Sequence, residues 1–140
     1  MKNLIYEIIA AAGTIDAAGI RVLKPLGLTP MTFNILTVLT DGPLSQREIS
    51  DRMIVAASSI TFQVRQLQKK GLIQRRRSDA RTWNVFLTPL GAEKQRLAEQ
   101  HMDQIIDQIP LDIIMARYAE SVLKTIQAHL PQLIEGKNKP

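Results

Sequence analysis

The chain has 140 residues, 45% of them apolar, with a formal net charge of +5 and no cysteine. A chain of this length and apolar content is expected to fold as one domain with its own core rather than to remain disordered. The absence of cysteine excludes disulfides, thiolate metal sites and thiol redox switches in this chain, which suits a cytoplasmic protein.

The positive charge is concentrated in one part of the chain. Between Ala56 and Trp83 there are seven lysines or arginines and one acid, so this segment carries +6 and the remainder carries −1. A local concentration of one sign is typical of a surface that meets a polyanion such as nucleic acid.

The first segment, residues 4–23, has apolar residues at three- and four-residue steps. This pattern predicts an amphipathic helix that ends near Lys24, because Pro25 disfavours helical geometry in the residue before it. The helix is either an ordinary core helix or a dimerisation helix. We expect no membrane partner, because three charged residues interrupt the apolar runs before the roughly 20 residues of a membrane span: Glu7, Asp16 and Arg21.

Two further helices are marked by their caps. Thr29, followed by a proline, is typical of a helix start, and the mostly apolar helix after it is expected in the interior, ending at the turn 41–43. Ser45 and Glu48 form a capping box at the start of a short helix that ends near Met53.

The next helix begins between Ala56 and Ser58 and ends before Gly71, a typical helix stop. Its apolar stripe is expected to face the core and consists of Ile60, Val64 and Leu67. Its opposite face is polar and cationic, with one aromatic side chain, and consists of Ser58, Phe62, Arg65 and Lys69, flanked by Ser59, Thr61 and Gln66.

A β-hairpin is predicted after this helix, formed by residues 72–77 and 83–87 with turn-forming residues between them. Trp83, Val85 and Leu87 alternate with other residues along the second strand. The arginines gather at the tip and in the first strand, where side chains alternate in direction, so Arg75, Arg76 and Arg77 are not expected to face one partner together.

The C-terminal part is predicted to form a long helix from Thr88 to Pro110, with Leu90 in its apolar stripe, and a last helix from about Asp112. The helices at both ends carry more apolar surface than a compact winged unit can cover, and a second copy of the chain is the simplest cover. We therefore expect one domain over residues 1–140, a winged helix-turn-helix at 29–88, and dimerisation helices at 1–25 and 89–135.

A helix-turn-helix followed by a two-stranded wing is a DNA-docking device, because a helix fits the major groove while a basic hairpin straddles the adjacent backbone. The alternative is a winged-helix module that binds protein or structured RNA. The sequence motifs of this chain are more specific than the bare helix-turn-helix pattern. LGLTPMTFNILTVL, LSQREIS, SSITFQVRQLQKKGLIQRR, a D-x-R at Asp79 and Arg81, and VFLTPLG follow in this order, and together they resemble the MarR family of bacterial transcriptional regulators.

The resemblance implies a mainly helical fold with a small β-hairpin wing, and a homodimer that binds double-stranded DNA at a palindromic operator. It also implies repression and release by a small aromatic or anionic effector. Arg81 matches the arginine that reaches the minor groove in the family, and Asp79 matches the acid that orients the wing. Phe62 departs from the family, which often has arginine or proline there, and is placed either to meet a thymine methyl or to pack against the neighbouring helix.

The candidate DNA-binding residues are Ser58, Ser59, Thr61, Phe62, Arg65, Gln66, Lys69, Arg75, Arg77 and Arg81, with Asp79 positioning the wing. No catalytic residue, metal site or cofactor is expected. The two histidines, His101 and His129, are far apart in sequence, and Asp103 and Asp107 form an ordinary exposed pair. The sequence offers neither a nucleophile with its base nor a phosphate-binding glycine loop.

Overall fold

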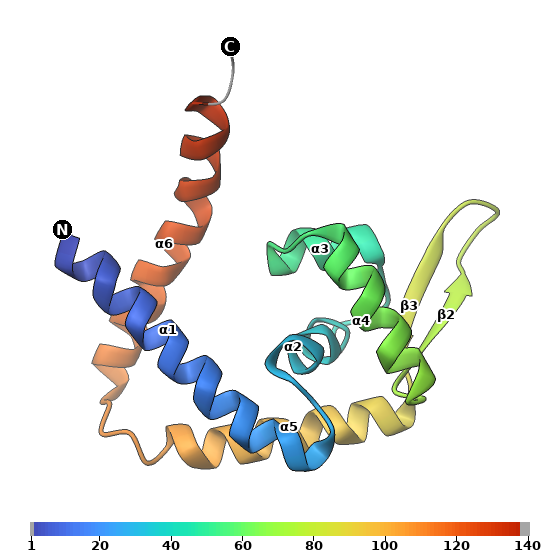
Figure 1. The fold of residues 1–140 in the computed structure, drawn as a ribbon, viewed down its shortest axis with the longest axis horizontal. Coiled ribbons are helices and arrows are strands. Elements are labelled where there is room, and N and C mark those ends of the chain that lie inside the picture. Colours follow the sequence, from blue (N-terminus) through green and yellow to red (C-terminus); the bar gives the residue numbers. More distant parts are fainter. Residues whose placement is uncertain (1, 138–140) are drawn as a thin grey trace. The chain divides into compact units, whose positions relative to one another are not determined.

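The structure, a computed structural model, describes residues 2–137 and is mainly helical with one small antiparallel sheet (Figure 1). The expected fold class is therefore confirmed. By its contacts the chain divides into two compact units, residues up to Gln104 and residues from Ile105. In chain order the elements are α1 (Lys2–Leu23), the 3-10 turn η1 (Lys24–Leu26), α2 (Pro30–Val38), β1 (Leu44–Ser45), α3 (Gln46–Met53), α4 (Ala57–Lys69), β2 (Ile73–Arg77), β3 (Trp83–Leu87), α5 (Pro89–Ile106) and α6 (Ile113–Lys137).

The starts of α2 and α3 follow from side chains that satisfy free backbone groups. Thr29 caps α2, since its hydroxyl oxygen accepts the Thr32 N–H at 3.2 Å while the Thr32 hydroxyl oxygen accepts the Thr29 N–H at 2.8 Å. Ser45 and Glu48 form the predicted reciprocal pair at the start of α3, with distances of 2.7 and 3.1 Å. Hydrogen bonds from Ser45 hold the pKa of Glu48 below its ordinary value.

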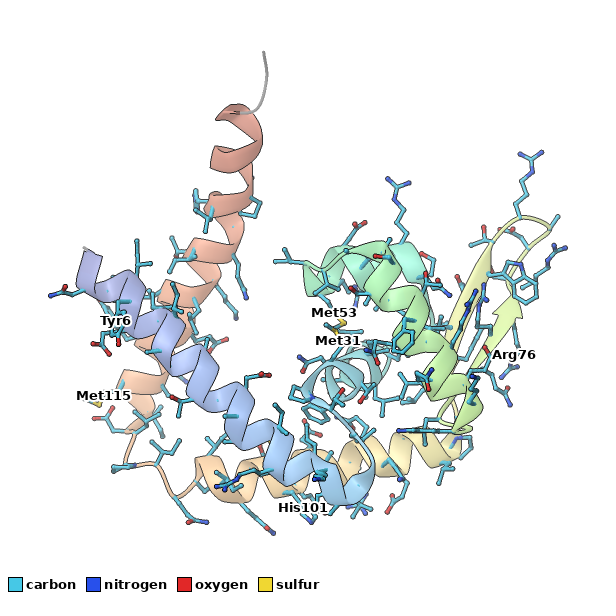
Figure 2. All side chains as sticks on the ribbon, in the orientation of Figure 1. Tyr6, Met31, Met53, Arg76, His101 and Met115 are labelled. Atoms are coloured by element: carbon cyan, nitrogen blue, oxygen red, sulfur yellow. The ribbon has the colours of Figure 1, made fainter. Side chains whose placement is uncertain are left out.

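The core of the first unit lies among α1, α2, α3, α4, the base of the hairpin and α5. Figure 1 shows α2, α3 and α4 gathered beside the β2–β3 hairpin. The buried apolar residues are Leu23, Leu28, Ile35, Leu36, Leu39, Leu44, Ile49, Ile60, Val64, Leu67, Leu72, Ile73, Val85 and Ala98. Met31 and Met53, labelled in Figure 2, pack against this core from α2 and α3.

The sheet has the strand order β1-β3-β2, with both pairs antiparallel. In the hairpin, Arg75 lies opposite Val85 and Arg77 lies opposite Trp83. On the other edge of β3, Leu44 of β1 lies opposite Val85. The sequence predicted the hairpin but not β1, because a strand of two residues is too short to show a period.

The junction between the hairpin and α5 is tight. The Thr88 hydroxyl donates to the Gly71 carbonyl at 2.7 Å and accepts the Gly91 N–H at 3.0 Å. Gly91, Gln95 and Ala98 form the buried side of α5. Leu90, which was expected in the apolar stripe, is instead 53% exposed, because the helix turns Gly91 against the backbone of Leu72.

The long helix also ends earlier than expected, at Ile106 rather than at Pro110. The next residues form tight turns, in which Gln108 N–H donates to the Ile105 carbonyl at 3.1 Å and Ile109 N–H donates to the Ile106 carbonyl at 2.9 Å. The proline therefore does not itself end the helix.

The second unit is built on α6, whose first turn is capped by Asp112 through the Met115 N–H at 2.7 Å. Many of its large apolar side chains are exposed, as are several on α1. In the second unit they are Ile105, Ile106, Ile109, Leu111, Ile113, Met115, Tyr118, Leu123 and Leu130, and on α1 they are Leu4, Ile5, Tyr6, Ile9, Ile15 and Ile20.

By length and hydropathy alone, the stretch Asn3–Leu26 is apolar enough to cross a membrane. A helix that is covered by a partner chain shows the same exposed apolar face when one chain is considered alone. The stretch also contains the charged residues Glu7, Asp16 and Arg21.

Candidate nucleic-acid interface

Helix α4 turns one side into the core and the other side to solvent. Ile60, Val64 and Leu67 are fully buried, which fixes the rotation of the helix about its axis and confirms the predicted stripe. On the opposite side, Phe62 leaves 58% of its surface exposed, so it does not pack into the core. The other exposed side chains there are Ser58, Ser59, Arg65 and Lys69, with Thr61 and Gln66 half-buried at the edges.

The first turn of α4 presents hydroxyl groups that do not cap the helix. Its N-cap is Ala56, and no side chain makes a capping hydrogen bond. Ser58 and Ser59 are exposed in this turn. The Thr61 hydroxyl lies 3.1 Å from the Ala57 carbonyl oxygen and 3.1 Å from Oε1 of Gln46 in α3, so it ties the two helices together.

The turn between α3 and α4 is short and strained. Ile54 has φ 56° and ψ 46°, a left-handed conformation that β-branched residues rarely adopt. The Ser50 hydroxyl donates to the Val55 carbonyl at 2.6 Å, and the Val55 N–H donates to the Ser50 carbonyl at 3.2 Å. These bonds close the turn and hold α4 at a fixed position against α3.

Lys70 belongs to the basic segment but is used inside the first unit. Its Nζ donates to the Gly27 carbonyl at 2.8 Å, and Lys94 of α5 donates from Nζ to the neighbouring Leu26 carbonyl at 2.6 Å. Neither contact could be predicted from the sequence, because they join residues 43 and 68 positions apart.

The wing consists of the β2–β3 hairpin and its tip, residues 78–82. Because side chains alternate along a strand, Arg75 and Arg77 lie on one face with Trp83, and Arg76, labelled in Figure 2, lies on the other. The guanidinium carbons of Arg75 and Arg77 lie 5.4 and 5.3 Å from the centre of the Trp83 ring. Arg76 lies 4.7 Å from the centre of the Phe86 ring.

Trp83 is 45% exposed, although it lies on the same face of β3 as the core residue Val85. Val85 is fully buried, and Trp83 comes two residues before it on the strand, where the hairpin has already left the core. Trp83 was therefore not among the residues predicted for the candidate interface. The signal that reveals it is the strand register, which places Arg77 directly across from it.

Asp79 organises the tip of the wing. Its Oδ1 accepts the N–H of Arg81 at 2.8 Å and the N–H of Thr82 at 2.7 Å, and these bonds hold the pKa of the Asp79 carboxyl below its ordinary value. The contact with Arg81 thus goes to its backbone amide rather than to its guanidinium. Arg81 itself is exposed at the tip.

The cations of α4 and the wing are not neutralised by carboxylates. Among the described side chains, at residues 3–113 and 115–132, the ion pairs are Arg96 with Glu93 and Lys124 with Glu120, both outside this segment. Within the same range, no group of histidine, aspartate and glutamate side chains is arranged to hold a metal ion. The arrangement therefore offers an unpaired cationic surface made of one helix face and one hairpin, which suits a polyanion.

Comparison with known proteins gives sequence and fold matches to transcriptional regulators. The sequence model of the MarR family matches residues 26–81, from η1 to the tip of the wing. The chain is 30% identical to the uncharacterised HTH-type transcriptional regulator YwoH of Bacillus subtilis over 95 residues, which cover 67% of this chain and 69% of YwoH.

Two solved structures have a similar fold. CouR from Rhodococcus jostii, solved with bound p-coumaroyl-CoA, has a TM-score of 0.81 and 20% identity, covering 88% of this chain and 90% of CouR. A mutant of MarR from E. coli, solved with operator DNA, has a TM-score of 0.77 and 23% identity, covering 89% of this chain and 93% of that chain. At these identities the likeness shows the fold alone.

Proposed function

Because this chain belongs to the MarR family of transcriptional regulators, we propose that it is a homodimeric repressor that binds a palindromic operator and is released by a small ligand. Regulators of this family bind DNA and are not enzymes. One observation carries the proposal for this chain: α4 exposes a polar and cationic face beside a basic wing, and no carboxylate with a described side chain pairs with those cations.

In this proposal α4 lies in the major groove and the wing lies along the adjacent backbone. Ser58, Ser59 and Phe62 are near the start of α4, the part of a recognition helix that contacts base edges. Arg65 and Lys69 are further along the same exposed face, where they meet phosphates. Thr61 and Gln66 sit at the edges of that face and contribute less, because both are half-buried.

The wing adds Arg75, Arg77 and Arg81. Arg81 is exposed at the tip, and Asp79 holds the backbone of that tip in one conformation, so Arg81 is placed to enter the minor groove. Lysines and arginines that neutralise phosphates release counterions, which gives affinity that does not depend on sequence. Selection among sequences then falls to the first turns of α4.

The dimer is supported by apolar surface that a single chain leaves uncovered. Large side chains on α1, on the end of α5 and on α6 are exposed, in number well beyond the isolated apolar residues of ordinary surfaces. A second copy of the chain covers them, with residues 1–25 and 89–135 as dimerisation helices and residues 29–88 as the DNA-binding region. Two copies related by a twofold axis then match a palindromic operator.

Repression follows if the operator overlaps a promoter, because the bound dimer then excludes the polymerase. A small aromatic or anionic effector is proposed because CouR, which shares the fold, was solved with p-coumaroyl-CoA. A repressor acts where the DNA is, so the proposed location is the cytoplasm.

The proposal is tested by selecting duplexes from random DNA with the purified chain and footprinting the selected site. We expect two half-sites about 10–11 base pairs apart, protection that weakens steeply with salt, and a dimer by sedimentation at the same concentration. A chain that is monomeric, or that prefers a structured RNA competitor to every selected duplex, would contradict it.

Phe62 provides a test of sequence selection. Because its ring is 58% exposed on the face opposite the core, Phe62→Ala should relax base preference at one position in each half-site and change the melting temperature little. The measurement is a comparison of selected sequences for the two proteins. Unaltered preference together with a large loss of melting temperature would assign Phe62 to packing.

A further inference from the structure

Trp83 is the only tryptophan in the chain, and it stands partly exposed on the wing. Large aromatic side chains bury much apolar surface and are usually covered. Here the ring is instead accompanied by two guanidinium groups, from Arg75 and Arg77, at 5.4 and 5.3 Å from its centre. Both distances are within the roughly 6 Å over which a cation is attracted to an aromatic face.

Two like charges beside one ring repel each other, and the ring partly offsets this repulsion. Neither Arg75 nor Arg77 forms an ion pair with any carboxylate whose side chain the structure describes. A cation–π contact leaves the in-plane N–H donors of a guanidinium free for an anion. The cluster of Trp83, Arg75 and Arg77 is therefore held in place by the protein while its hydrogen-bonding capacity remains unused.

The strand register shows which way the cluster faces. Ile73 and Val85 lie on the same face of the hairpin as Trp83, and both are buried in the core that also contains the apolar stripe of α4. The Trp83 face is therefore a continuation of the side turned towards α4. Arg76 and Phe86 are on the reverse face, directed away from that side.

We propose that Trp83 is a positioning residue that holds Arg75 and Arg77 ready to bind DNA phosphates on the α4 side of the wing. The inference rests on the proposed DNA-binding function. An arginine side chain that is already ordered loses less conformational entropy when it binds a phosphate. Ordering a mobile arginine on binding would instead lower the affinity. Trp83 itself need not touch DNA.

The test measures binding to a mixed-sequence duplex of about 30 base pairs, because phosphate contacts do not require the operator. We expect Trp83→Leu to lower the affinity on the order of tenfold, from two side chains that are no longer ordered. Trp83→Phe keeps an aromatic face and should remain within about threefold of the wild type. Phe86→Leu is the matched control on the reverse face and should remain within about twofold.

A second background separates positioning from folding. In a chain that carries Arg75→Gln and Arg77→Gln, Trp83→Leu should have no further effect on affinity, because the groups it orders are gone. A tenfold loss in that background as well would show that Trp83 supports the fold, and would overturn the proposal. Equal affinity of Trp83→Leu and wild type for the duplex would also overturn it.

The native tryptophan gives a readout that does not depend on replacing it. Because Trp83 is the sole tryptophan, its fluorescence reports on this cluster alone. The Arg75→Gln and Arg77→Gln chain should show a changed emission without DNA, and a smaller response to the duplex than the wild type. Unchanged emission would exclude the stacked arrangement. Failure of the wild-type chain to bind any duplex would instead remove the proposed function, and this inference with it.

Discussion

Gly91 is the position where a single added methyl group should damage the first unit most. A Cβ built at this residue would stand 1.9 Å from the Leu72 carbonyl oxygen and 3.0 Å from Cδ1 of Leu87. Ordinary van der Waals contact begins near 3.4 Å. Gly91→Ala therefore requires the start of α5 and the Leu72 backbone, just before β2, to separate by roughly 1.5 Å, because a backbone carbonyl cannot rotate away as a side chain does.

The same separation disrupts the hydrogen bonds at this junction. The Thr88 N–H donates to the Leu72 carbonyl at 3.1 Å, and the Thr88 hydroxyl donates to the Gly71 carbonyl at 2.7 Å. Overpacking costs about 1–3 kcal/mol, and each lost bond costs about 1 kcal/mol. We expect Gly91→Ala to lower the free energy of unfolding by about 3–5 kcal/mol, a large part of the 5–15 kcal/mol typical of a domain.

The assay is urea unfolding followed by circular dichroism at one fixed chain concentration, since the stability of a dimer depends on concentration. Gly13→Ala is the matched control, because a Cβ at that position in α1 meets no atom within 4 Å. The control should gain up to about 1 kcal/mol from helix propensity. If Gly91→Ala unfolds within about 1 kcal/mol of the wild type, the close approach of α5 to Leu72 is not a feature of the folded protein.

Three further outcomes are expected. Ile54→Asn should stabilise the chain by about 1 kcal/mol in urea unfolding, because asparagine tolerates the left-handed backbone that strains isoleucine, whereas Ile54→Val should bring no gain. The pKa of Glu48 is lowered in the folded state, so its contribution to the free energy of unfolding is complete above the ordinary value of 4.5 and is lost as pH falls through the folded-state pKa. The wild type should therefore exceed Glu48→Gln in urea midpoint by more at pH 7 than at low pH. An equal difference in midpoint at both pH values would contradict this. Arg81→Ala should weaken duplex binding by about 1–3 kcal/mol in a titration with unchanged melting temperature, and unaltered affinity would exclude a role for the wing tip in binding.

Much of the first unit was predictable because its boundaries are set by local chemistry. The N-cap at Thr29, the capping box at Ser45 and the left-handed stop at Gly71 act on residues a few positions away, and the sequence shows them directly. The exposed face of α4 was predictable for the same reason, since burial of Ile60, Val64 and Leu67 fixes which side faces solvent.

The features that were missed depend on contacts between distant parts of the chain. The exposed position of Leu90 follows from the packing of the next residue against Leu72, which no helical period records. The exposure of Trp83 beside two arginines follows from where the hairpin leaves the core, which the alternation along the strand does not show. Asp79 was correctly placed near Arg81, but its hydrogen bond to the backbone rather than to the guanidinium depends on the conformation of the turn.

The Lys70 ammonium group connects the last turn of α4 to the carbonyl of a residue 43 positions earlier in the chain. Lys94 of α5 donates to the adjacent Leu26 carbonyl, so α4 and α5 are both hydrogen-bonded to the short segment Leu26–Gly27 that follows α1. Because a helix is stiff along its axis, displacing its C-terminal end tilts the whole helix. In the proposed complex, the angle at which Ser58 approaches the duplex is therefore set partly by the short turn that follows α1.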